Sequence, residues 1–402
     1  MATRNKVITI FLSNPCYIDR KLLITDSSWY RFATQMGLKG DTLNIVAPDL
    51  VDSTSSFDIK LKKEVKFKKV KHFFYNSFKG FYQHAIIHPV SFVKDYFRIV
   101  KLSEYILFRI PTPGFTLIAL MSFLLKKPII VFISGNIVGQ SDSYLNSKGL
   151  MRVLMFLILK IRVKLHSIIL RRCFYIFCVS KDVMELYDIE CNEKVEILRT
   201  PIVSTQDIDF SKVRHLQPKP TELFKIIRVC WIQESKGLEN LIDAVYKVSQ
   251  SFKISLDIYG SAKNSVYGNQ IKNLISELDM DEVIKLRGWV SNQDLQKMYN
   301  NFDLHIMSSK AEGMPRVCLE SAAKGLPQLL TPVGGIPDFF THLHDAYITE
   351  DCSSKEIQKG LEWFLDHREL IEDLVDNALS GVHKSSIESA ATRVNGLFMQ
   401  DI

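Results

Sequence analysis

The feature that most constrains the fold of this chain is a strand-turn-helix pattern over residues 303–327. Residues 303–308 (Asp-Leu-His-Ile-Met-Ser) read as a short buried strand. Pro315 suits the first turn of a following helix, Gly325 suits the residue just past its end, and Pro327 prevents the helix from continuing. The pattern therefore predicts a strand and a helix joined by a loop at the strand's carboxyl end, which is where open α/β sheets bind their ligands.

Two glutamates occupy this segment, and a second unit of the same kind follows it. Glu312 lies on the loop, and Glu320 lies about a turn and a half into the helix. Residues 327–338 then repeat the order strand, turn and helix, with Gly334 and Gly335 at the turn. Paired glycines after a strand let backbone N–H groups approach a phosphate, and a helix N-terminus favours negative charge. From these residues alone, a ligand site and a capped helix with surface glutamates both remain open.

Two such units in succession resemble the nucleotide-sugar half of the retaining family-4 glycosyltransferases. The family pattern runs Ser-x-x-Glu-Gly-x-Pro-x4-Glu-x4-Gly-x-Pro, and residues 309–327 match it with charges, glycines and prolines in register. The fold of that family is GT-B. The resemblance therefore implies an α/β chain with two doubly wound, parallel-sheet, Rossmann-like domains facing a cleft.

The resemblance also implies roles for single residues in donor binding. Glu320 would accept hydrogen bonds from the ribose hydroxyls, for which an ionised carboxylate is well suited. Glu312 would hold hydroxyls of the donor sugar, with Gly313, Met314 and Pro315 beside it. The amides around the Gly-Gly turn at 334–335 would stabilise the departing diphosphate.

An upstream strand shows both agreement with the family and a departure from it. The family has Gly-Arg-Leu-x3-Lys-Gly after this strand, and Lys236 and Gly237 fit that pattern. Cys230 stands where glycine is usual, and Trp231 stands where arginine is usual. Tryptophan supplies no guanidinium charge, although its ring can stack on a sugar or a base. We therefore expect Lys236 to carry more of the task of stabilising the diphosphate.

The first half of the chain offers four further candidates. Arg109 ends an apolar strand, and both a role in the site and a structural ion pair stay open for it. Asn136 follows another strand, at a position where many relatives have a histidine, and either contacts sugar hydroxyls or builds a turn. Ser13 and Asn14 follow the first strand, where relatives have a glycine-rich turn near the donor phosphate. The Arg-x-Pro sequence at 109–111, with Gly-Asn in place of the histidine, resembles the branch of the family that builds bacterial surface polysaccharides.

The length of 402 residues favours two domains. Alternating strand and helix patterns predict a first domain over residues 1–205 and a second, nucleotide-sugar-binding domain over 223–385. Residues 206–222 lack periodicity and are the predicted linker. The final helix, 386–402, is expected to pack back on the first domain, as the resemblance implies.

The charge is unevenly distributed and suggests an anionic partner for the first half. Residues 1–200 contain 30 Lys and Arg against 16 Asp and Glu, whereas residues 201–402 contain 21 against 28. A membrane phospholipid or a diphosphate-linked acceptor fits such a basic half. Nucleic acid is not expected, because no zinc-finger spacing or ribonucleoprotein motif is present.

The seven scattered cysteines form no metal array, and a reducing cytoplasm is the expected location.

Residues 149–172 carry six cations and no acid among bulky apolar side chains. On a helix, Lys160, Lys164 and Arg171 would share one face. An interfacial segment on anionic lipid and a core helix with snorkelling cations both remain open. Neither a secretion signal nor an apolar run long enough to span a bilayer is found, so we expect a peripheral protein on the inner face of the plasma membrane.

The resemblance as a whole implies a retaining, metal-independent glycosyltransferase without a cofactor. Its donor would be a UDP- or GDP-sugar, and its acceptor a lipid-linked saccharide or glycan in O-antigen, capsule or lipopolysaccharide synthesis. Two alternatives stay open. A nucleotide-sugar 2-epimerase shares the GT-B fold but works on a soluble substrate. A catalytically weakened, donor-binding scaffold subunit would fit Trp231 and the missing histidine.

Overall fold

The structure is a computed structural model of the chain, and two compact units can be distinguished in it. Unit 1 comprises Met1–Pro201 and Ile387–Ile402, and unit 2 comprises Ile202–Ser386. The residues that the structure describes are 6–12, 16–19, 22–25, 29–37, 41–46, 57–60, 65–67, 89–110, 114–134, 150–198, 202–210, 223–262 and 264–399.

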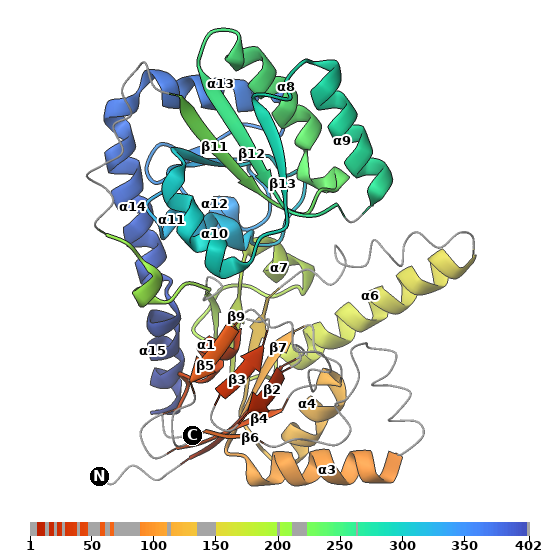
Figure 1. The fold of residues 1–402 in the computed structure, drawn as a ribbon. Helices are drawn as coiled ribbons and strands as arrows, with labels where there is room; N and C mark the ends of the chain where they lie inside the picture. The colour runs from red at the N-terminus through yellow and green to blue at the C-terminus, as the bar shows by residue number, and fades with distance from the viewer. Residues whose placement is uncertain are drawn as a thin grey trace. The chain divides into compact units, whose positions relative to one another are not determined.

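Unit 1 is built on a parallel sheet in the order β10-β9-β8-β7-β1-β4-β6 (Figure 1). Its strands are β1 (Val7–Phe11), β4 (Thr42–Val46), β6 (Val65–Phe67), β7 (Tyr105–Ile110), β8 (Ile129–Ile133), β9 (Tyr175–Cys178) and β10 (Val195–Ile197). A smaller antiparallel sheet contains β2 (Cys16–Asp19), β3 (Leu22–Thr25) and β5 (Phe57–Lys60). Because β1 pairs with both β4 and β7, the strand order reverses between β1 and β7.

Helices cover both faces of the larger sheet of unit 1. They are α1 (Trp29–Ala33), α3 (Pro89–Leu102), α4 (Phe115–Leu124), α6 (Leu150–Leu170), α7 (Lys181–Leu186) and α15 (Ile387–Phe398). Along β7 the buried side chains alternate between two hydrophobic clusters: Phe108 packs with residues of α3 and α4, and Leu107 packs with residues of α1 and α15. This alternation follows from the two-residue period of a strand and explains why β7 is apolar throughout.

The last helix, α15, packs within unit 1 although it follows unit 2 in the sequence. It contacts α1, and Val394 and Phe398 are buried in the same cluster as Ile8. The ring of Phe398 lies 4.9 Å from that of Tyr105, measured between centroids. The chain therefore returns to its first unit through a buried apolar helix face.

Unit 2 contains a second parallel sheet, in the order β13-β12-β11-β14-β15-β16. Its strands are β11 (Phe224–Val229), β12 (Ile254–Tyr259), β13 (Ile284–Gly288), β14 (Leu304–Met307), β15 (Gln328–Leu330) and β16 (Tyr347–Ile348). The helices are α8 (Leu238–Ser249), α9 (Ser265–Glu277), α10 (Asn292–Met298), α11 (Arg316–Ala322), α12 (Ile336–Phe339), α13 (Ser354–Asp366) and α14 (Ile371–Lys384), with 3-10 turns at Thr205–Asp207, Glu234–Lys236, Tyr299–Asn301 and Arg368–Leu370. The predicted doubly wound α/β fold is thereby confirmed.

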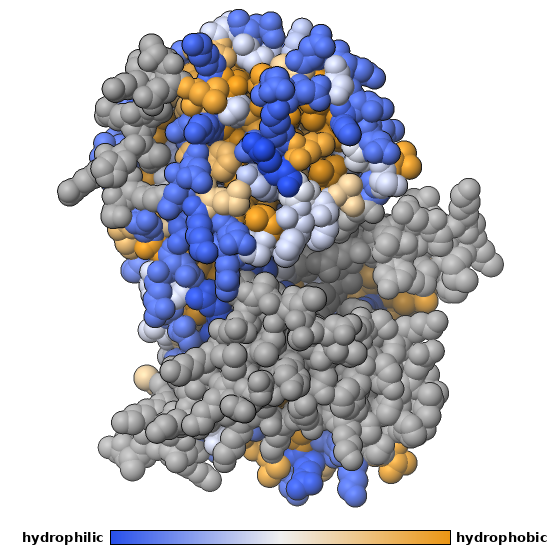
Figure 2. All heavy atoms as spheres, in the orientation of Figure 1, coloured by the Kyte–Doolittle hydropathy of each residue, from blue (hydrophilic) through white to orange (hydrophobic). Residues whose placement is uncertain are grey.

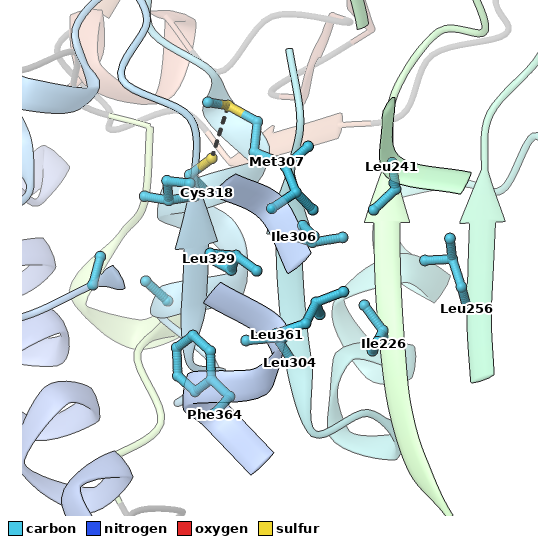
Figure 3. Packing of buried hydrophobic residues seen from close by; sticks show 14 of the residues in the cluster. Ile226, Leu241, Leu256, Leu304, Ile306, Met307, Cys318, Leu329, Leu361 and Phe364 are labelled. Atoms are coloured by element: carbon cyan, nitrogen blue, oxygen red, sulfur yellow. Dashed lines mark hydrogen bonds between the residues drawn. The ribbon is translucent and has the colours of Figure 1, made fainter. Parts of the chain in front are cut away.

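The core of unit 2 lies between its sheet and the helices α8, α11, α13 and α14. Figure 3 shows Leu304 and Leu329 of the sheet facing Phe364 of α13. The thiol of Cys318 on α11 donates to the sulfur of Met307 at 3.6 Å, which joins the helix to the end of β14. This packing holds α11 against the carboxyl end of β14.

Residues 205–210 of unit 2 lie against the end of α11. The N–H of Asp209 donates to the carbonyl of Ala323 at 2.9 Å, and Lys324 Nζ donates to the carbonyl of Asp207 at 2.5 Å. The first part of the predicted linker is thus fixed to unit 2. The remainder, 211–222, lies outside the described residues.

No helix in the described ranges is both long enough and apolar enough to cross a bilayer.

Candidate functional site

Three loops of unit 2 meet where its strand order reverses. Because β11 pairs with both β12 and β14, the loops after β11, β14 and β15 follow three neighbouring parallel strands. The N–H of Lys310 donates to the carbonyl of Ser235 at 2.8 Å, which ties the second loop to the first. A reversal point of this kind is the place where open α/β sheets bind ligands.

An ion pair joins two of the predicted site residues. Lys236 Nζ lies 2.6 Å from Glu312 Oε1, and the two side chains are 13% and 17% exposed. The hydroxyl of Ser309 donates to the same carboxylate oxygen at 2.8 Å. The fold therefore brings together a cation and a carboxylate that are 76 residues apart in the sequence.

A glycine permits the first and second loops to approach so closely. Gly237 has φ +61°, and a Cβ atom there would lie 2.2 Å from the carbonyl oxygen of Ser308. The Ser308 hydroxyl donates to the carbonyl of Lys236 at 2.9 Å. A side chain at 237 would push the lysine loop away from the end of β14, so this position requires glycine.

The Gly-Gly turn after β15 closes against the loop that carries Glu312. A Cβ atom at Gly334, where φ is +58°, would lie 2.0 Å from the carbonyl oxygen of Gly313. The N–H of Gly335 donates to that same carbonyl at 2.6 Å. The amide of Gly335 is thus bonded to the loop that carries Glu312. Within the described part of the chain, the amide of Gly334 makes no such bond, so it remains the candidate for phosphate.

Glu320 is a buried carboxyl group on α11, with 7% of the residue exposed. Burial raises its pKa, while the charge of Arg316 and a hydrogen bond from Asn292 act in the opposite direction. Arg316 Nη2 lies 3.5 Å from Glu320 Oε1, one helical turn away. The carboxyl group is thus shielded from water yet only loosely paired, which suits an acceptor for ligand hydroxyls.

Trp231 leaves the end of β11 and is 48% exposed. The preceding residue, Cys230, donates its N–H to the carbonyl of Tyr259, and burial raises the pKa of its thiol. Met314 and Pro315 follow Glu312 on its loop, and Met314 packs against the core while its sulfur lies near Gly335. The tryptophan ring is thus accessible at the same edge of the sheet.

The candidates of the first half of the chain lie in unit 1. The guanidinium of Arg109 lies 4.6 Å above the ring of Trp29, and its Nε donates to the hydroxyl of Ser134 at 2.8 Å. Arg109 thus has partners of its own within unit 1. Ser13, Asn14 and Asn136 lie outside the described residues.

The predicted membrane residues lie on α6 or directly after it. Lys160 and Lys164 are exposed on the helix. Arg171 follows the helix and forms an ion pair with Asp188. Arg171 therefore lies beyond the end of the helix that carries the two lysines.

Sequence reasoning missed Arg228, the buried cation of β11, whereas Lys225 in the same strand is exposed. Arg228 is 1% exposed, and its Nη2 donates to the hydroxyl of Ser309 at 2.8 Å. The available signal was a lone arginine within the apolar stretch Phe-Lys-Ile-Ile-Arg-Val. In the described ranges, no group of three or more His, Cys, Asp or Glu residues is arranged to hold a metal ion.

Comparison with known proteins finds similar sequences over the part of the chain that contains the site. The family model "Glycosyl transferases group 1" matches residues 209–380, which include all three loops of the site. An uncharacterized glycosyltransferase of Methanocaldococcus jannaschii is 27% identical over 149 residues, which are 37% of this chain and 37% of the relative. The putative colanic acid biosynthesis glycosyltransferase WcaL of Salmonella typhimurium is 22% identical over 210 residues, 50% of this chain and 51% of the relative. The matches thus span about a third to a half of the length of these relatives.

The fold has a counterpart among solved structures. The crystal structure of Anabaena Alr3699/HepE in complex with UDP superimposes with a TM-score of 0.67 at 14% identity, and the match covers 98% of this chain and 99% of that one. At this identity the likeness concerns the fold alone, and it extends over both units. The chain therefore has the GT-B fold, and its residues 209–380 match the family model "Glycosyl transferases group 1".

Proposed function

We propose that the chain is a retaining glycosyltransferase that transfers a sugar from a UDP- or GDP-sugar. The observation that carries the proposal is the Lys236–Glu312 pair at the strand reversal of a group 1 domain. When the donor binds, each member of the pair can contact a different part of it. The ammonium group attracts the phosphates, and the carboxylate accepts hydrogen bonds from the sugar hydroxyls.

Each residue of the site then has a chemical role. Lys236 and the amide of Gly334 stabilise the negative charge that grows on the departing diphosphate. Glu312 holds hydroxyls of the donor sugar, Glu320 accepts from the ribose hydroxyls, and Trp231 stacks on the base or the sugar. These roles place the charge stabilisation of the transfer step in unit 2.

In the transfer step, the bond between the sugar carbon and the diphosphate oxygen breaks while a bond to the acceptor oxygen forms on the same face. The acceptor proton passes to the departing diphosphate. No metal ion or cofactor takes part in this scheme, so activity is expected to survive saturating EDTA. A requirement for magnesium or manganese in the chemical step would contradict it.

A screen of nucleotide sugars by thermal shift tests donor binding. A ligand at about a hundred times its dissociation constant stabilises the protein by roughly 2.7 kcal/mol. Lys236→Ala should then lower turnover more than donor binding, because the diphosphate charge grows during transfer. Interconversion of the donor without an acceptor would instead indicate the 2-epimerase. Donor binding with neither transfer nor hydrolysis would indicate the scaffold subunit.

We further propose a lipid-linked saccharide or glycan acceptor, in the synthesis of a surface polysaccharide. The name of the WcaL relative refers to colanic acid biosynthesis. Such an acceptor would be reached from the cytoplasmic face of the plasma membrane, by a chain that binds the membrane surface peripherally.

An exposed apolar stripe on α6 supports this location. The stripe recurs at helical spacing and consists of Val153, Leu157, Ile161, Leu165 and Ile168. Lys160 and Lys164 are exposed on the same helix, while the opposite side packs into the core through His166 and Ile169. In Figure 1 the start of α6 projects away from the sheet of unit 1. An apolar face flanked by lysines suits an anionic lipid surface.

Helix α3 has a similar composition. Exposed Val93 and Phe97 alternate with exposed Lys94 and Arg98. Hydrophobic and hydrophilic residues lie side by side along this helix in Figure 2. Since α4 contacts both α3 and α6, the three helices belong to one side of unit 1.

Co-sedimentation with liposomes tests the membrane proposal. Binding should require anionic lipid and fall with added salt, because each surface cation contributes about 1 kcal/mol and is screened over about 10 Å. Changing Lys160 and Lys164 to Gln should weaken it, as should Leu157→Asn with Ile161→Asn. Arg171→Gln is the comparison variant, since it removes the same formal charge at a residue that follows the end of α6. Equal binding to neutral vesicles, or none to anionic ones, would reject the membrane surface and leave the transferase proposal intact.

A further inference from the structure

A buried arginine lies directly behind the Lys236–Glu312 pair. Arg228 Nη2 donates to Ser309 Oγ at 2.8 Å, and Ser309 Oγ donates to Glu312 Oε1 at 2.8 Å. The Ser309 hydroxyl accepts a hydrogen bond from Arg228 with a lone pair, and it therefore still has its one proton to donate to the Glu312 carboxylate. Thr331 fixes the same serine from the third loop, because its hydroxyl donates to the Ser309 carbonyl at 2.7 Å. One chain of contacts therefore runs from the interior of β11 to the surface of the site.

The charges along this chain do not cancel. Within the described residues, no carboxylate lies within ion-pair distance of Arg228, so Glu312 faces two cations, Arg228 through Ser309 and Lys236 directly. The neighbouring His305 is neutral, since burial and the arginine charge lower its pKa to about 3. Burial keeps the Cys230 and Cys318 thiols neutral by raising their pKa.

Two further cations beside the loops have acids of their own. Lys310 lies 3.8 Å from Glu239, and Arg316 lies 3.5 Å from Glu320. The charges of the buried Arg228 and the half-buried Lys236 and Glu312 sum to one positive charge, whereas Glu234 on the same loop is exposed to solvent. A buried cation without its own counter-ion is costly, and a bound anion supplies the missing negative charge.

We infer that Arg228 is a positioning residue for the donor diphosphate. It fixes Glu312 through Ser309, and its charge gives the site the positive potential that Trp231, at the position where the family has arginine, does not supply. The inference rests on the proposed function, since it assigns the diphosphate of that donor as the anion. Arg228 itself lies beneath the loops and acts through its neighbours.

Two substitutions separate the charge of Arg228 from its hydrogen bond. Arg228→Gln is neutral but keeps a donor for Ser309, and Arg228→Lys keeps the charge. Two charges about 10 Å apart change an affinity by roughly tenfold at the effective dielectric constant of a partly buried site. We expect Arg228→Gln to weaken binding of UDP or GDP, whichever binds the wild type more tightly, about tenfold in calorimetry. The matching nucleoside, which is uncharged, should bind as before, and Arg228→Lys should restore most of the diphosphate affinity.

The control is Arg287→Gln, which removes the same formal charge from β13, two strands away in the sheet, where Arg287 pairs with Asp257 at 3.1 Å. It should change neither affinity. If Arg228→Gln does not fold, Arg228→Met serves instead, because an apolar side chain of similar length often replaces a buried charge without loss of stability.

The outcomes distinguish the two proposals. Equal losses for nucleoside and nucleotide would show a purely structural role and overturn the inference, as would an unchanged diphosphate affinity. Inorganic pyrophosphate covers the case in which neither nucleotide binds the wild type. If pyrophosphate then stabilises the wild type but not Arg228→Gln, the inference stands and the proposed donor class fails. If it stabilises both equally, or neither, the inference fails as well.

Discussion

At the scale of single residues, two buried glutamates of unit 2 have different surroundings. Glu356 on α13 is 8% exposed and forms an ion pair of 2.5 Å with Lys359. Glu320 on α11 is 7% exposed, but Arg316 approaches its carboxylate only to 3.5 Å. Arg316 and a hydrogen bond from Asn292 use only part of the acceptor capacity of the Glu320 carboxylate, and its remaining lone pairs are available to the hydroxyls of a ligand.

Glu320→Gln should fold normally and bind the donor weakly. The amide keeps the shape of the side chain but loses the charge-assisted acceptor, which is worth roughly 1.5–3 kcal/mol. Calorimetry with the nucleotide sugar measures the loss. Glu356→Gln is the matched control and should bind donor like the wild type. Equal donor affinity in both variants would remove Glu320 from the ribose contact.

The buried His305 should make unit 2 sensitive to acid. Burial lowers its pKa from 6.5 to about 3 in the folded state, so the unfolded chain takes up a proton first as the pH falls. The stabilising contribution is therefore complete above pH 6.5 and is lost as the pH falls toward 3. Between pH 6 and 4 this histidine should cost about 1.4 kcal/mol of unfolding free energy per pH unit.

His305→Asn should reduce that slope, because asparagine can still donate to Gln328 Oε1, the partner of His305 Nδ1 at 2.8 Å, and does not titrate. Urea unfolding at pH 7 and pH 5 measures the difference. A variant at 305 with the wild-type slope would assign the acid sensitivity to other groups.

At the scale of elements, the site depends on two turns that contact each other through backbone atoms. The loop after β14 presents the carbonyl of Gly313 to the turn at Gly334 and Gly335. A methyl group added at position 334 would meet backbone atoms, which cannot move aside as the end of a flexible side chain could. The relative position of Glu312 and the Gly-Gly turn is therefore set by the absence of a side chain at 334.

Gly334→Ala should separate these two turns. The new Cβ would meet the Gly313 carbonyl at 2.0 Å with φ at +58°, and residues in such backbone regions cost of order 1–3 kcal/mol. We expect a lower melting temperature and weaker donor binding. Gly313→Ala is the control, because nothing lies within 4 Å of its Cβ position. Similar effects of both substitutions would indicate that the loops adjust freely.

The sequence predicted the strands and helices around the site better than their contacts. The pattern at 303–327 predicted β14, α11 and the loop between them, because prolines, glycines and apolar runs act locally. It could not show that Gly335 donates to Gly313, or that Arg228 reaches Ser309, because these contacts depend on which strands become neighbours. The helix α3 at 89–102 and the antiparallel β2-β3-β5 sheet were also not predicted. In α3 charged residues interrupt the apolar spacing, and the face that stays exposed is partly apolar.

At the scale of the whole molecule, the two units differ in how the chain forms them, because one is continuous in sequence and the other is not. The core of unit 2 is formed within residues 202–382, whereas that of unit 1 includes residues at both ends of the sequence. Unit 1 consequently needs α15 to complete one face of its sheet. A chain that lacks this helix would expose the apolar face that Val394 and Phe398 cover.

A pair of phenylalanine substitutions should therefore act on different units. Phe398→Ala in α15 and Phe364→Ala in α13 each remove a fully buried ring, which typically costs about 3–5 kcal/mol of unfolding free energy. Because Phe398 packs with Tyr105 and Ile8, its loss should reduce hydrogen-exchange protection in the strands of unit 1. Nucleotide binding, which the proposed function assigns to unit 2, should persist at 25 °C. Phe364→Ala should instead reduce protection in β14 and β15 and weaken nucleotide binding. Loss of protection in both units from Phe398→Ala alone would mean that the two cores unfold as one cooperative body, and that α15 stabilises the site as well as the unit in which it is buried.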